Sequence, residues 1–220
     1  MVGGIPVHYR GGGENVVATY DYTDIAEGTG VVVFYGTNNY DSVGADYYLS
    51  TTVTPSTYIG VWAGTTGTEY TKAGDYDFDL SAFNLPKRIK GTARFIFTQI
   101  GKGGTNDAIS QYLTFKIRKY SGTTETEIAN VTSQTVTLGS SSGVVGSIMG
   151  QVAVSIPTIQ NFMKGDILRI TVEVYAKLLT SGGTGYAGIA CDPKDRDDAA
   201  FKEDADSSIF EAHIPFVLDL

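Results

Sequence analysis

Carboxylates are the side chains in this sequence whose number and spacing could do chemistry, and they gather in two places. In the first, Asp75, Asp77 and Asp79 alternate with three apolar residues. A period of two puts the three acids on one face of a β-strand and the apolar residues on the other. Three like charges on one face are unfavourable unless water or opposite charges neutralise them. We therefore expect this face to be solvated or paired with cations.

The second group of acids lies in one segment, Asp192 to Asp206, which has no strand pattern. Hard cations such as calcium take six to eight oxygen ligands, often from such a loop. The spacing and glycine of an EF-hand are missing, so two interpretations stay open, a solvated loop and a calcium site. The predicted calcium ligands are Asp192, Asp195, Asp197 and Asp198. We expect no other cofactor.

Nucleophilic chemistry has few candidates. Cys191 and His213 could in principle form a nucleophile and base, but Cys191 fits better as a small buried thiol at a strand end. The run Gly183–Gly188 matches the pattern GxGxxG, yet no helix follows it to bind a phosphate. No zinc-protease motif or nucleophile elbow is present. The sequence therefore predicts a chain that is not an enzyme.

Aromatic side chains offer a further possibility. Trp62, with Tyr40, Tyr47 and Tyr48 close in sequence, could form an exposed platform on which a sugar ring stacks. The alternative is that these rings fill the core or line subunit contacts, because burial dominates the energetics of aromatic side chains. We favour the second interpretation.

The elements that must position these residues are strands, since period-two alternation recurs along the chain and helical periodicity is nearly absent. The clearest example is Asp166–Tyr175, where Leu168, Ile170, Val172 and Val174 alternate with polar residues as in a half-buried antiparallel strand. The predicted strands cover residues 15–22, 31–35, 47–53, 58–62, 76–80, 89–100, 112–120, 126–138, 151–156, 167–178 and 209–218.

This pattern predicts an all-β fold, an antiparallel two-sheet β-sandwich for which we expect jelly-roll topology. The glycine-rich residues 1–14 are expected to form an extended N-terminal arm. Residues 15–220 are expected to form a single domain, because no shift in composition divides them.

Composition excludes several classes of protein. Of the 220 residues, 42% are hydrophobic and 18% are charged, which is too apolar for a disordered chain. The formal charge of −8 argues against a nucleic-acid-binding surface. One cysteine excludes an intrachain disulfide. The longest fully apolar run is Val31–Tyr35 and no basic leader precedes it, so we expect no membrane span and no secretory signal.

A resemblance suggests a function. Phrases such as Tyr20–Gly30 (YDYTDIAEGTG) look like virion proteins of tailed viruses, and Phe162–Ile170 (FMKGDILRI) is similar to a turn-and-strand phrase of jelly-roll virion modules. The resemblance implies a structural subunit that decorates a viral capsid, located in the virion. Its partners would be copies of itself, as a trimer, and the major capsid protein. No nucleic acid or membrane partner is implied.

Two other functions remain open. One is a carbohydrate- or receptor-binding module of a tail fibre or spike, which would use a groove around Trp62. The other is a β-sandwich hydrolase that acts on glycans through two facing carboxylates, whose separation the sequence cannot set.

Overall fold

The computed structural model describes residues 29–40, 45–52, 60–104, 107–139, 145–180, 183–191 and 209–217. These residues form twelve β-strands and no helix, which confirms the predicted all-β class. With no helix among them, the described residues also contain none long and apolar enough to cross a membrane. The predicted arm (1–14), the predicted strand 15–22 and the acidic segment 192–206 lie outside the described residues.

The strands agree with the alternation in the sequence, although several are longer than expected. Their bounds are β1 Thr29–Tyr40, β2 Ala45–Ser50, β3 Gly60–Thr65, β4 Thr71–Asp79, β5 Lys87–Lys102, β6 Ile109–Ser121, β7 Thr124–Thr132, β8 Val136–Leu138, β9 Val145–Phe162, β10 Ile167–Leu178, β11 Gly185–Ala190 and β12 Phe210–Val217. Strand β10 has the predicted limits. The predicted strand 126–138 is divided into β7 and β8, and β11 was not among the predicted strands.

Hydrogen bonding joins the strands in the order β3-β11-β5-β12-β1-β2-β4-β10-β6-β7, with β8 on β6 and β9 on β5. The pairs are antiparallel except for β2 and β4, which meet in parallel at Tyr48 and Asp79. The order is far from chain order, because β10 lies between β4 and β6 and β12 lies between β1 and β5.

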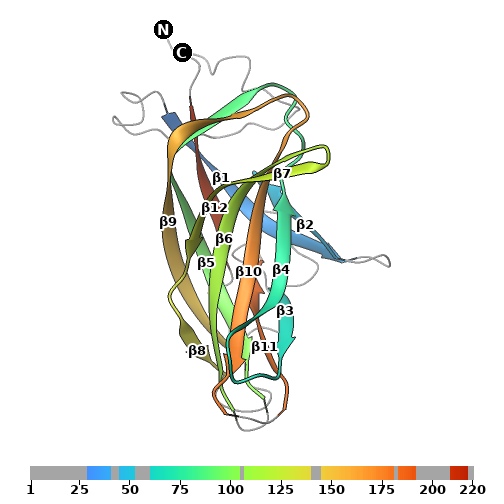
Figure 1. The fold of residues 1–220 in the computed structure, drawn as a ribbon, viewed down its shortest axis with the longest axis vertical. Coiled ribbons are helices and arrows are strands. Elements are labelled where there is room, and N and C mark those ends of the chain that lie inside the picture. Colours follow the sequence, from blue (N-terminus) through green and yellow to red (C-terminus); the bar gives the residue numbers. More distant parts are fainter. Residues whose placement is uncertain are drawn as a thin grey trace.

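The sheet curves back on itself around an aromatic core. Phe95 of β5 stacks on Phe115 of β6, with ring centroids 4.9 Å apart, although β5 and β6 stand far apart in the hydrogen-bonded order. Phe97 also contacts Phe115, and Phe78 of β4 contacts Phe210 of β12. Figure 1 shows β5 and β9 curving beside β6, β10 and β4 along the long axis of the molecule. A two-sheet jelly roll in particular is not confirmed by these pairings.

Strand β10 shows how the sequence produces this arrangement. Its residues Leu168, Ile170, Val172 and Val174 are fully buried, while the alternate residues face outward. The preceding turn is closed by Asp166, whose backbone N–H bonds the carbonyl of Met163 and whose carboxylate accepts the N–H of Met163. Gly165 has φ of 94°, a conformation that glycine adopts without strain. This turn sets the apolar side of β10 against the core and its polar side away from it, where side chains of the neighbouring strands cover Thr171 and Glu173.

Candidate functional site

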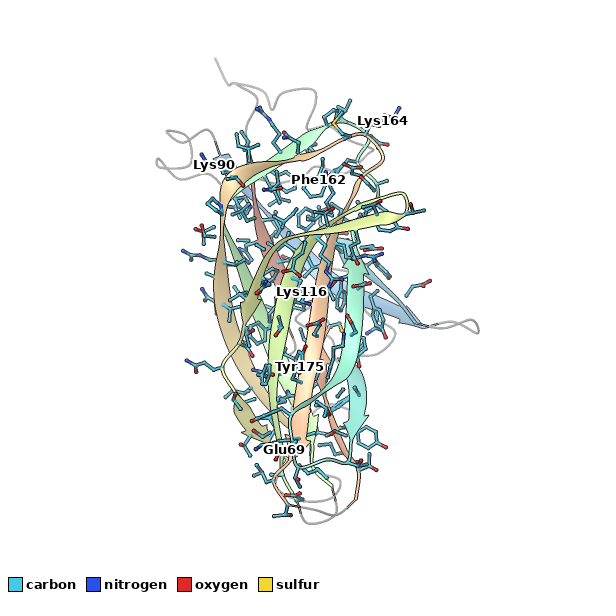
Figure 2. The ribbon with its side chains drawn as sticks, viewed as in Figure 1. Glu69, Lys90, Lys116, Phe162, Lys164 and Tyr175 are labelled. Atoms are coloured by element: carbon cyan, nitrogen blue, oxygen red, sulfur yellow. The ribbon has the colours of Figure 1, made fainter. Side chains whose placement is uncertain are left out.

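The outward side of β4, β10, β6 and β7 carries charged and tyrosine side chains across four neighbouring strands. We call this surface the polar face. Figure 2 shows Lys116 on β6 and Tyr175 on β10 near its middle. Its members are Lys72, Asp75, Asp77, Asp79, Tyr112, Thr114, Lys116, Arg118, Tyr120, Glu125, Glu127, Arg169, Thr171, Glu173 and Tyr175.

The register of the strands places opposite charges on the same rung. Arg169 of β10 lies opposite Asp79 of β4, and Thr171 lies opposite Asp77. On its other side, Thr171 lies opposite Lys116 of β6. Directly opposed residues on one face of a sheet lie within contact distance. The acids of β4 therefore meet the polar residues of β10, from a part of the chain about ninety residues later.

Arg169 forms the centre of one cluster. Its guanidinium donates two hydrogen bonds to Asp79, at 2.6 Å from Nε and 2.7 Å from Nη2, and a third to Asp77 at 3.0 Å. Nη1 also lies 3.3 Å from Oε1 of Glu125, and the group lies over the ring of Tyr120. The hydrogen bonds to Asp79 raise the pKa of Arg169, so the charge is permanent. One cation thus neutralises carboxylates from β4 and β7.

Glu173 forms the centre of the second cluster, and it is 5% exposed. Its carboxylate accepts hydrogen bonds from Lys116 at 2.8 Å, from Lys72 at 3.4 Å and from the hydroxyl of Tyr175 at 3.3 Å. Burial by itself would raise the pKa of Glu173, but the hydrogen bond and charge of Lys116, together with Lys72, hold that pKa below its usual range. Lys72 also pairs with Asp75 at 2.7 Å.

A row of tyrosines continues the polar face beyond Glu173. Tyr112 and Tyr175 stack with centroids 5.0 Å apart and ring planes 7° from parallel. Tyr70, just before β4, packs against Tyr112 at 5.3 Å and shares a hydrogen bond of 2.8 Å with Ser110. The ammonium of Lys177 lies 4.7 Å from the centre of the Tyr70 ring. Rings held in this way offer rigid contact area, because little side-chain entropy remains to be lost on binding.

The polar face combines tyrosines, two arginines and ion pairs that are already formed. Burying an ion is costly when its charge has no partner. Here Arg169 and Glu173 have several partners each, so an incoming surface finds charges that are compensated in advance. This arrangement is suited to binding another surface. Among the described residues, no group of three or more His, Cys, Asp or Glu is arranged to hold a metal ion.

The expectation for the first acidic group is fulfilled. Asp75, Asp77 and Asp79 share a face, and Lys72 and Arg169 neutralise them. Sequence reasoning identified the alternating outward residues Arg169, Thr171, Glu173 and Tyr175 of β10 but did not pair them with these acids. The sequence signal that could have suggested this pairing is that polar residues recur at every second position in both strands.

The other predicted site residues are not brought into this cluster. Cys191 is buried and His213 pairs with Glu211 at 2.9 Å on β12. Trp62 is half-buried on β3. Tyr47 packs against Tyr76 and against Phe78 of the core, as the core interpretation expects. The predicted calcium ligands Asp192, Asp195, Asp197 and Asp198 and the side chain of Tyr40 lie outside the described residues.

No protein-family model and no curated protein matches the sequence. Among solved structures, the chain is similar to an aminopeptidase from the marine sediment archaeon Thaumarchaeota archaeon. The TM-score is 0.51 at 6% identity, over 86% of this chain and 37% of that one. It is also similar to an α-amino acid ester hydrolase, with a TM-score of 0.51 at 9% identity, over 84% of this chain and 36% of that one. At these identities the likeness shows the fold, and the chain spans little more than a third of either enzyme.

These neighbours contradict two sequence-based predictions, a structural subunit of a viral capsid and a chain that is not an enzyme. The matching structures are hydrolases. A virus structure, infectious bursal disease virus Gx strain, matches with a TM-score of only 0.27 at 11% identity, over 85% of this chain and 56% of that one, so the resemblance to tailed-virus proteins is not confirmed. The resemblance misleads because the phrase Phe162–Ile170 encodes only an antiparallel turn and the start of a half-buried strand. Any protein with such a turn needs similar residues.

Proposed function

We propose that this chain is a jelly-roll β-sandwich domain of a hydrolytic enzyme that cleaves ester or amide bonds of amino acid derivatives. The observation that carries the proposal is the shared fold with an aminopeptidase and an α-amino acid ester hydrolase over 84–86% of this chain. Because this chain corresponds to 36–37% of those enzymes, we infer that it works together with a separate catalytic part.

The polar face is the surface that we assign to contact with that catalytic part. Interfaces between proteins are enriched in tyrosine and arginine, whereas lysine, aspartate and glutamate are depleted at their cores and lie at the rim. The polar face has Tyr112 and Tyr175 stacked together and Arg169 bonded to its carboxylates before any partner arrives. A preformed network of this kind lowers the entropic and desolvation costs of docking.

The experiment is an affinity isolation of the tagged chain from the organism that encodes it. The eluate is assayed with α-amino acid p-nitrophenyl esters and aminoacyl p-nitroanilides, and the tag alone serves as the control. We expect hydrolysis of at least one substrate class to be enriched with the chain. Hydrolysis at the level of the tag-only control, for both classes, would overturn the proposed function.

A further inference from the structure

A two-stranded ribbon covers the end of the molecule at which β10 begins. The start of β5 pairs there with the end of β9, and Lys87 lies opposite Phe162. Figure 1 shows these two segments crossing the upper end together. A bulge bends the ribbon, because residues 157–159 of β9 oppose a single residue of β5 and Gly91 beside it has φ of 119°. The loop before β5 and the turn after β9 therefore meet at this end.

This loop and this turn are held together from below. The N–H of Gly165 donates to the carbonyl of Phe83, and the N–H of Phe83 donates to the carbonyl of Asp166. The rings of Phe83 and Phe162 pack edge to face, with centroids 5.3 Å apart. Phe162 is fully buried. The core is thus closed by these two rings, and the side chains above them are free to contact something else.

The upper surface of this end exposes large apolar side chains. We call residues 84–88 and 157–164 the basic ridge. Leu85 is 49% exposed and Ile159 is 45% exposed. Met163, at 61%, is the most exposed large hydrophobic side chain in the described part of the chain. Apolar surface left in water loses the free energy that burial supplies, so exposed apolar side chains grouped in this way mark a contact surface.

The charges of the basic ridge are all positive. It contains Lys87, Arg88 and Lys164 and no aspartate or glutamate, in a chain of net charge −8. Lys119 of β6 adds a fourth cation, because its ammonium bonds the carbonyl of Asn161 at 3.2 Å. This end therefore carries local positive charge on a molecule that is negative as a whole.

Asp166 follows the ridge in sequence, and its carboxylate is held within the turn. It is 7% exposed and accepts hydrogen bonds from the N–H of Met163 at 2.7 Å and from the hydroxyl of Ser121. Lys164, in contrast, is exposed. Acid and base are thus separated at this end, with the carboxylate buried and the ammonium at the surface.

We propose that the basic ridge binds the surface of a membrane that contains anionic lipids. In this contact Leu85, Ile159 and Met163 enter the boundary between headgroups and acyl chains, and the cations contact the headgroups. Apolar side chains surrounded by lysine and arginine suit this boundary, because acyl chains receive the first and the negative surface potential attracts the second. Each lysine or arginine close to such a surface strengthens binding by roughly fivefold.

Two other occupants fit the ridge less well. A soluble polyanion would pair with the cations but would leave the three apolar side chains in water. A stable protein interface uses about 20–30 residues on each side, whereas the ridge has 13, five in one segment and eight in the other. The resemblance had implied no membrane partner, but a surface contact needs no membrane-spanning segment. The inference is independent of the proposed hydrolytic role.

The test is cosedimentation of the full chain with vesicles. One set is phosphatidylcholine alone, and the other contains about a quarter phosphatidylserine. We expect the wild type to sediment with the mixed vesicles and to stay in solution with phosphatidylcholine alone. Absence of binding to the mixed vesicles, or equal binding to both sets, would overturn the proposal.

A pair of variants tests the apolar contact. Leu85→Ser/Met163→Ser leaves the charge unchanged and should weaken binding to the mixed vesicles by at least roughly tenfold. The control Leu179→Ser/Tyr186→Ser changes two side chains of similar exposure, 50% and 43%, away from the ridge. Leu179 follows the other end of β10, and this control should bind as the wild type does. Unchanged binding of the first variant would indicate a soluble-polyanion site and would overturn the proposal.

A second pair tests the charges. Lys119→Gln/Lys164→Gln removes two cations of the ridge and should weaken binding on the order of 25-fold. Lys102→Gln/Lys177→Gln makes the same change toward the far ends of β5 and β10 and should have a much smaller effect. Equal loss in the two variants would show that only the net charge matters, which contradicts a contact located at the ridge.

A fluorescence measurement keeps the test valid if these variants fold poorly. Met163→Trp places an indole at the most exposed apolar position of the ridge, and Leu179→Trp places one at the opposite end. We expect the emission of Met163→Trp to shift to shorter wavelength when the mixed vesicles are added, and that of Leu179→Trp to stay constant. An unchanged spectrum for Met163→Trp, or the same shift in both, would overturn the proposed insertion.

Discussion

The guanidinium of Arg169 holds the carboxylate of Asp79 by two parallel hydrogen bonds, with Nε 2.6 Å from Oδ1 and Nη2 2.7 Å from Oδ2. The two residues face each other across β10 and β4, and Asp77 shares the same guanidinium. Charge-assisted bonds with this forked geometry are among the stronger polar contacts in proteins. The pair therefore supports, on the polar face, the register that burial of the opposite face sets for the two strands.

Replacing Arg169 should destabilise the fold. The variant Arg169→Met removes the cation that Asp77, Asp79 and Glu125 share. We expect its free energy of unfolding to fall by about 2 kcal/mol. Arg169→Lys keeps the charge but loses the fork, so its loss should be smaller. Urea unfolding at neutral pH measures both, with the exposed Lys90→Met as the control. Equal stability of Arg169→Met and the control would contradict the role given to this guanidinium.

The buried carboxylate of Glu173 should make stability depend on pH. Its pKa is lower in the folded protein than the usual 4.5, because Lys116 and Lys72 outweigh the effect of burial. The folded state thus binds a proton less readily than the unfolded state, and the stabilisation is present above pH 4.5. It is lost as the pH falls below that value through the folded pKa.

The matched variant is Glu173→Gln, which has no charge to lose. We expect the wild type to lose stability more steeply than Glu173→Gln as the pH falls from 5 toward 3, values chosen to span roughly the titration range of carboxylates. Chemical unfolding at a series of pH values measures this difference. Parallel curves for the two proteins would show that Glu173 titrates normally.

The close approach of β11 and β3 should make Gly188 intolerant of a side chain. A methyl group on Gly188 would overlap the backbone carbonyl of Val61, and backbone cannot move aside as a flexible side chain can. We expect Gly188→Ala to cost about 3 kcal/mol. Gly67→Ala is the control, because a side-chain carbon there meets no atom closer than 3.8 Å and the backbone requires no positive φ. Thermal unfolding compares the two, and similar midpoints would refute the close packing.

The alternation of residues predicted most of the strands that the structure describes, because one face of each is buried. Strand β10 was predicted with its full limits, since Ile167–Leu178 has no glycine or proline to break the pattern. Strand β11 was missed because Gly185 and Gly188 resemble loop residues, whereas here they permit close approach to neighbouring strands. Strand β9 was predicted only as residues 151–156, since Gly146, Gly150 and Pro157 interrupt its pattern.

The polar face could be predicted only in part. The acids of β4 and the polar residues of β10 were each visible as one side of a strand. Their meeting depends on strand order, which places β10 between β4 and β6. Nothing in local sequence determines which strands pair over separations of 90 residues or more, such as that between Asp79 and Arg169. Long-range pairing of this kind is decided by burial of the whole core.

The most direct test of the central claim, that the polar face docks on the catalytic part of a hydrolase, is the hydrolytic activity that co-purifies with tagged variants. Asp75→Lys reverses an exposed charge on the polar face, whereas Lys90→Glu reverses an exposed charge on β5 away from it. We predict that Asp75→Lys loses most of the co-purifying ester or amide hydrolysis while Lys90→Glu retains it. Equal activity with both variants would contradict the account.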